Sequence, residues 1–245
     1  MHRFYHSNPL KIRQSVILNE FASHHAIRVM RIKLHEELIL FNGDGFEYLA
    51  QVEDINKKIV KVKILRTEKN KKESPVKINL FQSISSNEKM DLVIQKATEL
   101  GACNIQPVFS ERSSIKLNQD RVKKKLLHWN QVAIAACEQS GRSKLPSIFI
   151  PKSISQIMQE KKLFKNSLNL LLHPYIEKRN PKLPSIPPES INIFIGPEGG
   201  FAEEEIELLQ TNKFIITQLG PRILRTETAP LAIIAILQYK YGDFA

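Results

Sequence analysis

Cysteines, long apolar runs and a signal segment are scarce or missing in this chain, and each shortage excludes a class of protein. Only Cys103 and Cys137 occur among the 245 residues, and both lie in apolar periodic segments. We therefore expect buried thiols in a reducing compartment rather than a disulfide or a metal site. No apolar run approaches the roughly 20 residues that a membrane helix needs, and the N-terminus lacks the basic-then-apolar pattern of a signal peptide. These absences predict a cytoplasmic protein without a membrane-spanning segment.

Several common catalytic and ligand-binding motifs are also missing. No G-x-G-x-x-G follows a strand, which counts against a Rossmann dinucleotide site. The lack of G-x-x-x-x-G-K-[ST] excludes a P-loop, and the lack of G-x-S-x-G excludes a nucleophile elbow. The seven histidines show no metal-ligand spacing, and the adjacent His24 and His25 would diverge on a helix. We expect no bound metal.

Positive charge, in contrast, is in excess. The chain has 36 Lys and Arg against 25 Asp and Glu, a net charge of +11. Residues 1–78 carry 15 basic against 9 acidic residues (+6), and the other 167 residues carry 21 against 16 (+5). Such an excess attracts polyanions and speeds their encounter. Charge alone does not decide whether the chain binds nucleic acid. The basic run at 121–125 is expected to be a solvated helix face.

The first seventy residues predict a small β-rich module. Two apolar segments flank Asn-Gly-Asp-Gly at 42–45, which is a strong hairpin signal because Asn and Gly tolerate positive φ. Apolar residues alternate with lysine at 59–64, as in a strand with one solvated face. A short helix with a basic end is expected at 24–31.

A charged segment at 68–75 predicts a linker, which divides the chain into a domain of residues 1–72 and one of residues 75–245. Beyond it, short apolar segments alternate with segments of helical periodicity, and this predicts an α/β layer structure around a mainly parallel sheet. Strands are expected at 76–81, 105–109, 168–172, 191–195 and 215–219. Helices are expected around 90–100, 122–136, 203–210 and 229–241.

Two loops have an unusual composition, and each follows an apolar strand. The first loop (196–201) holds three of the nine glycines, and the second loop (219–229) repeats the Gly-Pro pair and adds arginines, a glutamate and threonines. Glycine at the carboxyl end of a buried strand lets the backbone approach a ligand, and open α/β sheets bind ligands at such ends. Thr226 or Thr228 is expected to cap the next helix. The loops together predict a ligand site, with two unrelated tight turns as the alternative.

Both loops also match longer motifs. The first reads Gly-Pro-Glu-Gly-Gly-Phe at 196–201, and the second reads Leu-Gly-Pro-Arg-Ile-Leu-Arg-Thr-Glu-Thr-Ala at 219–229. Shorter matches at 95–101, 110–113 and 138–142 follow in the same order. By these motifs the chain resembles the RsmE-type 16S rRNA uridine-N3 methyltransferases of the SPOUT superfamily, over nearly its whole length.

The resemblance implies a fold, a cofactor and partners. The fold is α/β, with a C-terminal SPOUT methyltransferase domain tied in a trefoil knot and an N-terminal PUA-like β-barrel that handles RNA. The cofactor is S-adenosylmethionine, the substrate is N3 of a specific uridine in 16S rRNA on the 30S subunit, and family members are homodimers. A SPOUT methyltransferase acting on another RNA such as tRNA, and a non-catalytic ribosome-assembly factor, are the alternatives. Ala202 departs from a serine that often caps the following helix in the family, which costs that helix about 1 kcal/mol.

The resemblance also implies roles for individual residues. Because N3 of uracil bears a proton, its methylation requires a base or stabilisation of the developing anion. Arg225 is the leading candidate to stabilise that anion, and Glu198 or Glu227 to accept the proton or orient Arg225. As structural alternatives, Glu227 only pairs with an arginine and Glu198 only braces its loop.

Two sets of contacts complete these expectations. The predicted cofactor contacts are Leu171, Leu172, Gly196, Pro197, Glu198, Gly199, Gly200, Leu219, Gly220, Ile223, Leu224, Arg225 and Thr228. The predicted RNA contacts are Arg3, Arg28, Arg31, Lys89, Arg112 and Arg142. For Arg112 and Arg142, a dimer interface or an internal ion-pair network is the alternative.

Overall fold

The computed structural model describes residues 1–113, 115, 117–175 and 182–244, which form two compact units. The first unit consists of Met1–Glu73 and Ile134–Leu145, and the second of Ser74–Ala133 and Pro146–Ala245. The chain first passes between the units at Glu73 and Ser74, inside the charged segment 68–75. A piece from the middle of the chain therefore packs with the N-terminal residues, and nothing in its local composition signals this.

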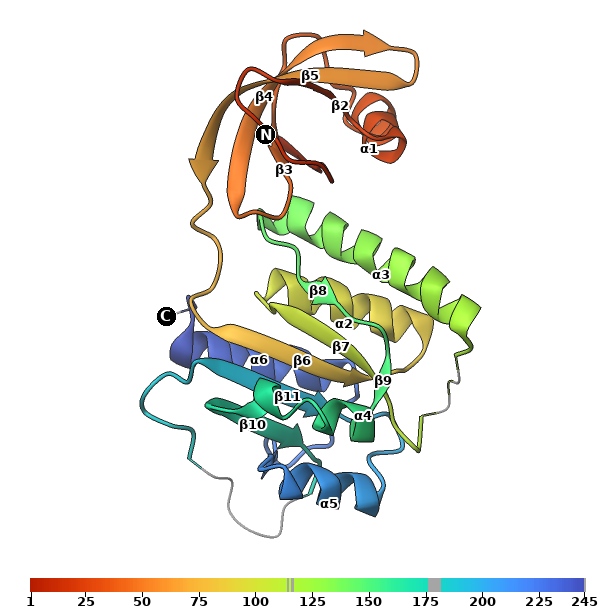
Figure 1. Cartoon of the computed structure of the whole chain (residues 1–245), viewed down its shortest axis with the longest axis vertical. Coiled ribbons are helices and arrows are strands. Elements are labelled where there is room, and N and C mark those ends of the chain that lie inside the picture. Colours follow the sequence, from red (N-terminus) through yellow and green to blue (C-terminus); the bar gives the residue numbers. More distant parts are fainter. Residues whose placement is uncertain (114, 116, 176–181, 245) are drawn as a thin grey trace. The chain divides into compact units, whose positions relative to one another are not determined.

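The first unit is built on a five-stranded sheet in the order β1-β3-β4-β5-β2 (Figure 1). Its strands are β1 (His2–Tyr5), β2 (Ser15–Ile17), β3 (Glu37–Phe41), β4 (Phe46–Asn56) and β5 (Ile59–Lys69). β1 pairs with β3 in parallel, and the other pairs are antiparallel. The predicted hairpin is confirmed as β3–β4, and its turn places Gly43 and Gly45 at φ of 92° and 90°.

The core of the first unit follows the two-residue period of its strands. Val60, Val62 and Ile64 of β5 are fully buried, whereas Lys63 between them is exposed. The helix expected at 24–31 differs in detail: α1 (Glu20–His24) begins earlier and continues as a π-helix, η1 (His25–Val29). α1 begins where it does because Asn19 Oδ1 accepts the Ala22 amide at 2.8 Å as an N-cap.

The second unit contains a seven-stranded sheet in the order β12-β10-β11-β6-β7-β8, with β9 also paired to β7. Its strands are β6 (Lys77–Ser83), β7 (Asn104–Phe109), β8 (Ser147–Ile148), β9 (Lys152–Ser153), β10 (Ser167–Leu172), β11 (Ser190–Ile195) and β12 (Ile215–Thr217). Every strand pair that the structure describes in this sheet is parallel, which confirms the predicted parallel α/β layer. β10 and β11 are buried on both faces, as their nearly all-apolar sequence predicts.

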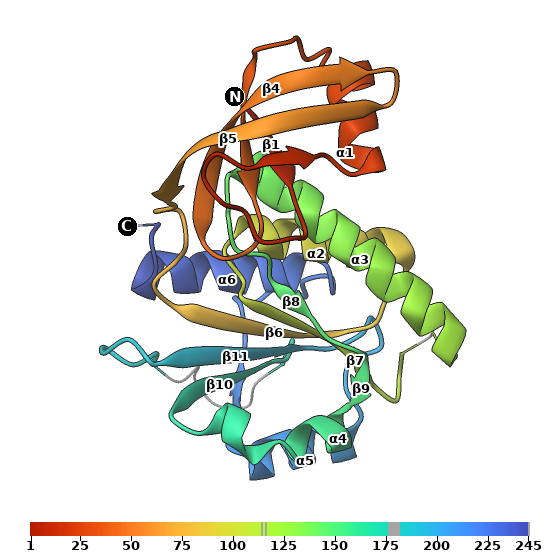
Figure 2. The same cartoon turned by 45° about the horizontal axis from the view of Figure 1, so that its top comes forward.

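Helices cover both faces of this sheet (Figures 1 and 2). They are α2 (Asn87–Glu99), α3 (Gln119–Ser140), α4 (Ile154–Met158), the 3-10 helix η2 (Lys161–Phe164), α5 (Glu203–Thr211) and α6 (Thr228–Tyr241). Apolar residues of α2, α6 and the part of α3 up to Ala133 pack with one face of the strands, and those of α4 and α5 with the other. No helix among the described residues is both long and apolar enough to cross a membrane.

The starts of α5 and α6 show how the two loops join their helices. α5 begins after Ala202, whose methyl group cannot cap, but Glu205 Oε2 accepts the Ala202 amide at 2.9 Å and supplies half of a capping box. At α6 the N-cap position is Glu227, which makes no side-chain capping bond. The prediction that Thr226 or Thr228 caps this helix is wrong, because the Thr226 hydroxyl is used elsewhere.

Candidate functional site

A cavity of about 360 Å³ lies where β10, β11 and β12 end. Its walls come from the first loop, the second loop and the two residues that follow β10, His173 and Pro174. These three strands are neighbours in the order β12-β10-β11, and parallel strands end at the same edge of a sheet. The sheet order therefore brings together two loops that are separated along the chain by α5 and β12.

Most predicted cofactor contacts meet in this cavity. Nine of the thirteen line it, namely Leu172, Gly196, Pro197, Glu198, Gly200, Leu219, Ile223, Leu224 and Arg225. The other four do not line it. Leu171 is fully buried in the core cluster on the far face of the sheet, and Thr228 is exposed at the start of α6. Gly199 faces Arg112, and Gly220 occupies a turn with φ of 68°.

Sequence reasoning missed several residues of the wall. Outside the two loops these are His173, Pro174, Ile195, Thr217 and Gln218. Inside the predicted loops, the wall also contains Phe201, Arg222, Thr226 and Ala229, which were not among the predicted contacts. His173 and Pro174 directly follow an apolar strand, the same signal that singled out the two loops, but this segment lacks glycine. Gln218 Nε2 donates to the Pro174 carbonyl at 2.8 Å and thereby joins this segment to the second loop.

A buried threonine connects the two loops. Thr226 is 6% exposed, and its Oγ1 donates to the Gly196 carbonyl at 2.7 Å. The same oxygen accepts Nε2 of Gln82, from β6, at 3.0 Å. Within the first loop, the Gly200 amide donates to the Pro197 carbonyl at 3.0 Å and Gly200 has φ of 71°. A residue with a side chain would be strained at Gly200, so the turn requires glycine.

An ion-pair cluster also spans the two loops. Lys89 Nζ of α2 lies 2.8 Å from Glu198 Oε1 of the first loop and 3.5 Å from Glu227 Oε2 of the second. The hydrogen bond to Glu198 raises the pKa of Lys89, so the amine stays protonated at neutral pH. Burial raises the pKa of Glu198, but the hydrogen bond from Lys89 outweighs it, and the net pKa is below the usual value.

The two glutamates of the cluster differ in their hydrogen bonding. The Glu227 side chain is only 15% exposed, and its Oε2 has no hydrogen-bond partner among the described residues. Glu198 is 44% exposed at the side chain and accepts the Lys89 hydrogen bond. The alternative in which Glu227 pairs with an arginine is wrong, since its partner is Lys89.

Arg222 and Arg225 bring two guanidinium groups to the cavity. Neither forms an ion pair with any residue that the structure describes. The Arg225 carbonyl accepts the amides of Thr228 and Ala229 at 2.9 and 3.0 Å, which fixes its backbone against the first turn of α6. The cavity thus has apolar walls, two unpaired cations and a buried carboxylate oxygen that accepts no hydrogen bond in this part of the chain.

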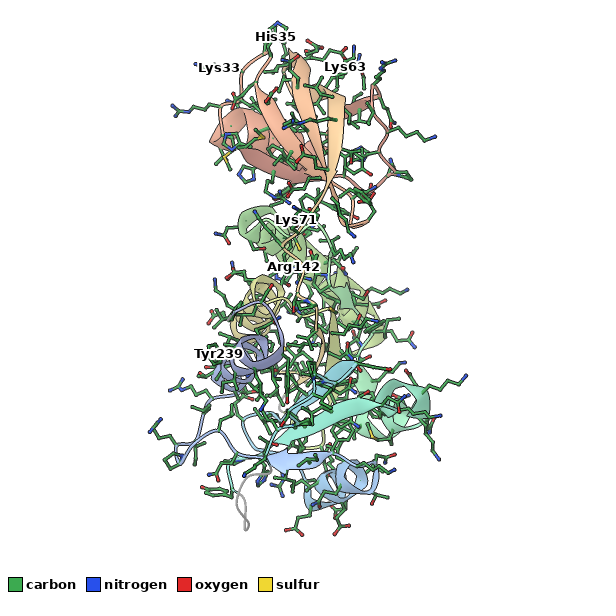
Figure 3. All side chains as sticks on the ribbon, turned by 90° about the vertical axis from the view of Figure 1, so that its left-hand side faces the viewer. Lys33, His35, Lys63, Lys71, Arg142 and Tyr239 are labelled. Carbon is green, nitrogen blue, oxygen red and sulfur yellow. The ribbon has the colours of Figure 1, made fainter. Side chains whose placement is uncertain are left out.

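Two of the predicted RNA contacts are engaged inside the first unit. Arg3 pairs with Glu47, and its Nη2 donates to the Arg142 carbonyl and to Ser143 Oγ, each at 3.1 Å. Arg142, labelled in Figure 3, is 4% exposed and its Nη2 lies 2.9 Å from Glu73 Oε2. The structure thus favours the internal ion-pair alternative for Arg142 and gives Arg3 the same role, because buried, paired guanidinium groups do not reach an RNA phosphate.

Three of the remaining predicted RNA contacts, Arg28, Arg31 and Arg112, are exposed, whereas Lys89 is half-buried and paired with Glu198. Arg28 and Arg31 are exposed at the end of η1, and Arg31 has φ of 53°. The chain then leads to exposed Lys33, which lies at the same end of the first unit as Lys63 (Figure 3). In the second unit Arg112 is exposed beside the first loop, with Nη1 at 3.5 Å from the Gly199 carbonyl.

Two family models match the chain. A model described as an RNA methyltransferase domain matches residues 72–238. A second, described as an RNA methyltransferase PUA domain, matches residues 18–65. The first of these includes every residue that lines the cavity.

Individual relatives match over nearly the full length. The ribosomal RNA small subunit methyltransferase E of Buchnera aphidicola subsp. Acyrthosiphon pisum is 35% identical over 99% of this chain and 94% of its own. A putative methyltransferase of Legionella pneumophila, solved in complex with SAM, is 39% identical with a TM-score of 0.92 and coverage of 99% and 98%. A ribosomal RNA small subunit methyltransferase E of Neisseria gonorrhoeae, solved bound to S-adenosyl methionine, is 36% identical with a TM-score of 0.88, over 100% of both chains.

Proposed function

The chain belongs to the RNA methyltransferase family, and on that premise we propose that it methylates N3 of a uridine in 16S rRNA with S-adenosylmethionine as donor. The observation that carries the proposal is the cavity in which both glycine-proline loops meet at the ends of β11 and β12. Relatives named for methylation of small-subunit ribosomal RNA match nearly the whole chain. Two relatives with TM-scores of 0.92 and 0.88 were solved with S-adenosylmethionine bound.

The residues of the cavity fit the proposed cofactor. Its volume of about 360 Å³ falls within the range of roughly 300–1,000 Å³ found for small-molecule pockets. Leu172, Leu219 and Leu224 give it apolar walls suited to an adenine ring. The loop backbones, held by Pro197 and the Thr226 hydrogen bonds, offer amides and carbonyls to the polar groups of a nucleoside.

The side chains at the cavity also fit the proposed chemistry. S-adenosylmethionine supplies an electrophilic methyl group on a sulfonium. For each transfer, a bond forms between uracil N3 and the methyl carbon, the sulfur–carbon bond breaks, and the N3 proton leaves to a base. We assign anion stabilisation on the uracil oxygens to Arg225, which lines the cavity and has no ion-pair partner in the described part of the chain.

Between the two carboxylates, the hydrogen bonding favours Glu227 as the proton acceptor. Its Oε2 accepts no hydrogen bond within the described ranges and has only the Lys89 amine at 3.5 Å as ion-pair partner, so it can accept a proton from a bound base. Glu198 accepts the Lys89 hydrogen bond, and its pKa is below the usual glutamate value, which disfavours its protonation. Glu198 is accordingly assigned to hold Lys89 and the first loop. The remaining predicted cofactor contacts keep that role in the proposal.

The same premise extends to partners and domains. We propose the segment 1–72 as an RNA-handling PUA domain and 75–245 as the methyltransferase domain, consistent with the two matched ranges. A trefoil knot at the two loops stays a prediction of the family resemblance. We also propose a homodimer through α6, because Ile236 and Tyr239 expose 45% and 69% of their surface on a helix whose Ile233, Ile234 and Leu237 are buried. Assembled 30S subunits are the proposed substrate.

A labelling experiment tests the substrate. The protein is incubated with S-adenosylmethionine carrying a labelled methyl group and with 30S subunits, naked 16S rRNA or tRNA, and the modified nucleoside is identified by mass spectrometry after digestion. We expect 3-methyluridine in 16S rRNA. Label found only in tRNA would overturn the ribosomal assignment, and a calorimetric titration without cofactor binding at millimolar concentration would overturn the methyltransferase activity itself.

A further inference from the structure

Three cations occupy one face of the first turns of α3. Arg121, Lys124 and Lys125, here called the basic stripe, are separated by three and four residues, so their side chains are neighbours on the helix. Arg121 and Lys124 are exposed and Lys125 is half-buried. Within the part of the chain that the structure describes, none of the three belongs to an ion pair.

The stability of the helix does not explain this placement. The start of a helix carries partial positive charge, which disfavours cations there. Like charges three or four residues apart also repel each other. Asp120 is the only acidic residue in the first turn. A polyanion lying along the stripe would relieve both repulsions at once.

The basic stripe leads toward the cavity. Lys125 Nζ donates to Asn87 Oδ1, at the first residue of α2. One turn further along α3, His128 Nε2 lies 2.7 Å from Asp91 Oδ2, also of α2. Between these two contacts on α2 lies Lys89, which lines the cavity and pairs with Glu198. Lys89 projects from a different side of α2 than Asn87 and Asp91. Because α2 follows β6, which pairs in parallel with β11, the starts of α2 and α3 lie at the same end of the sheet as the cavity.

We propose that the basic stripe binds phosphates of the RNA that flanks the target nucleotide, and so holds the strand across the mouth of the cavity. This inference rests on the proposed function. A base that reacts inside the cavity must leave its backbone outside, where the phosphates pass the cavity edge. The stripe supplies unpaired cations at that edge, and RNA backbone contacts are made largely by such Lys and Arg side chains.

A charge-matched pair of variants tests the stripe. The stripe variant carries Arg121→Gln, Lys124→Gln and Lys125→Gln. The control variant carries Lys161→Gln, Lys162→Gln and Lys165→Gln, three exposed lysines in and after η2. These precede β10, at the sheet edge opposite the cavity. Both variants lose three positive charges from the same unit, so a difference between them reports position rather than net charge.

The expected difference is in salt dependence. In filter binding to naked 16S rRNA, log K falls with log salt, and the stripe variant is expected to reduce the magnitude of this negative slope by about 2, since each phosphate contact to single-stranded RNA contributes about 0.7. Because this electrostatic effect fades near 1 M salt, the Kd at about 0.1 M salt then rises about a hundredfold. The control variant is expected to keep the wild-type slope. At saturating RNA the stripe variant keeps its kcat, because the cavity residues are unchanged, while its KM for RNA rises.

Each outcome has one meaning. Calorimetric binding of S-adenosylmethionine with wild-type affinity shows that both variants are folded, and a third variant with Arg121→Lys, Lys124→Arg and Lys125→Arg is expected to keep the wild-type slope. Equal slopes for the stripe and control variants, with rRNA methylation by the wild type intact, would overturn the stripe but leave the proposed function standing. If only the stripe variant had a salt slope of smaller magnitude and the wild type methylated no rRNA, the stripe would be supported as an RNA surface and the proposed rRNA methylation would be overturned.

Discussion

Replacing Thr226 by valine tests whether one buried hydroxyl joins the two loops of the cavity. Valine keeps the shape of threonine but removes Oγ1, which donates to the Gly196 carbonyl at 2.7 Å and accepts Gln82 Nε2 at 3.0 Å. Gln82 Nε2 keeps its bond to the Ser83 carbonyl at 3.2 Å, so the main loss is at Gly196. Leaving one buried polar group unsatisfied costs about 1–3 kcal/mol.

The expected stability loss of Thr226→Val is therefore about 2 kcal/mol. For a protein of this size, about 2–4 °C of melting temperature corresponds to each kcal/mol, so the melting temperature should fall by about 4–8 °C. Affinity for S-adenosylmethionine should fall as well, because the first loop is no longer held against the second. Urea or thermal unfolding measures the first effect and calorimetry the second.

Two neighbouring substitutions serve as controls for Thr226→Val. Thr226→Ser keeps the hydroxyl and is expected to retain most of the stability. Thr228→Val changes an exposed threonine at the start of α6 and is expected to be nearly neutral. If Thr228→Val were the destabilising change and Thr226→Val the neutral one, Thr228 would be the helix cap and the loop-bridging role of Thr226 would be refuted.

Three further predictions follow from single side chains. Arg225→Ala is expected to abolish methyl transfer and leave cofactor affinity largely intact, and unchanged turnover would remove Arg225 from catalysis. Burial raises the pKa of Glu138, so stability contributed by this site falls as pH rises from the usual glutamate range through the raised pKa. Glu138→Gln keeps an acceptor for the Tyr5 amide. In urea unfolding it should be more stable than wild type at pH 7, but not at a pH below the usual glutamate pKa. Equal urea midpoints for the two proteins at both of these pH values would contradict this. Burial raises the pKa of Cys137 to about 12, so its thiol should react with iodoacetamide only after unfolding, as read by peptide mass spectrometry.

The course of the backbone could largely be predicted from local patterns. The lysine alternation of β5, the nearly all-apolar runs of β10 and β11, and the glycine turn between β3 and β4 are each a period or a turn that a few residues encode. Short elements were missed for the same reason. β8 and β9 have two residues each, too few to show a period.

Charged side chains were the hardest to assign from sequence. Arg142 and Arg112 sit in similar matching motifs, yet Arg142 is buried against Glu73 and Arg112 is exposed beside Gly199. A pairing with an arginine was one alternative for Glu227, but its ion-pair partner is Lys89, some 138 positions away along the chain. The sequence shows which residues are charged, but the partner of each charged side chain depends on contacts between distant segments.

By itself, the sequence determined that two glycine-proline loops each end an apolar strand, and its motifs pointed to a methyltransferase family that the comparisons confirm. Only the tertiary structure decided that the loops share one cavity, because β10 lies between β11 and β12 in the sheet and that order depends on long-range pairing. It also decided which hydroxyl bridges the loops, which carboxylate accepts the Lys89 hydrogen bond and which of the described basic residues form no ion pair. Local sequence encodes periodicity and turns, whereas pairing across the fold is settled by which distant segments can bury their surfaces together.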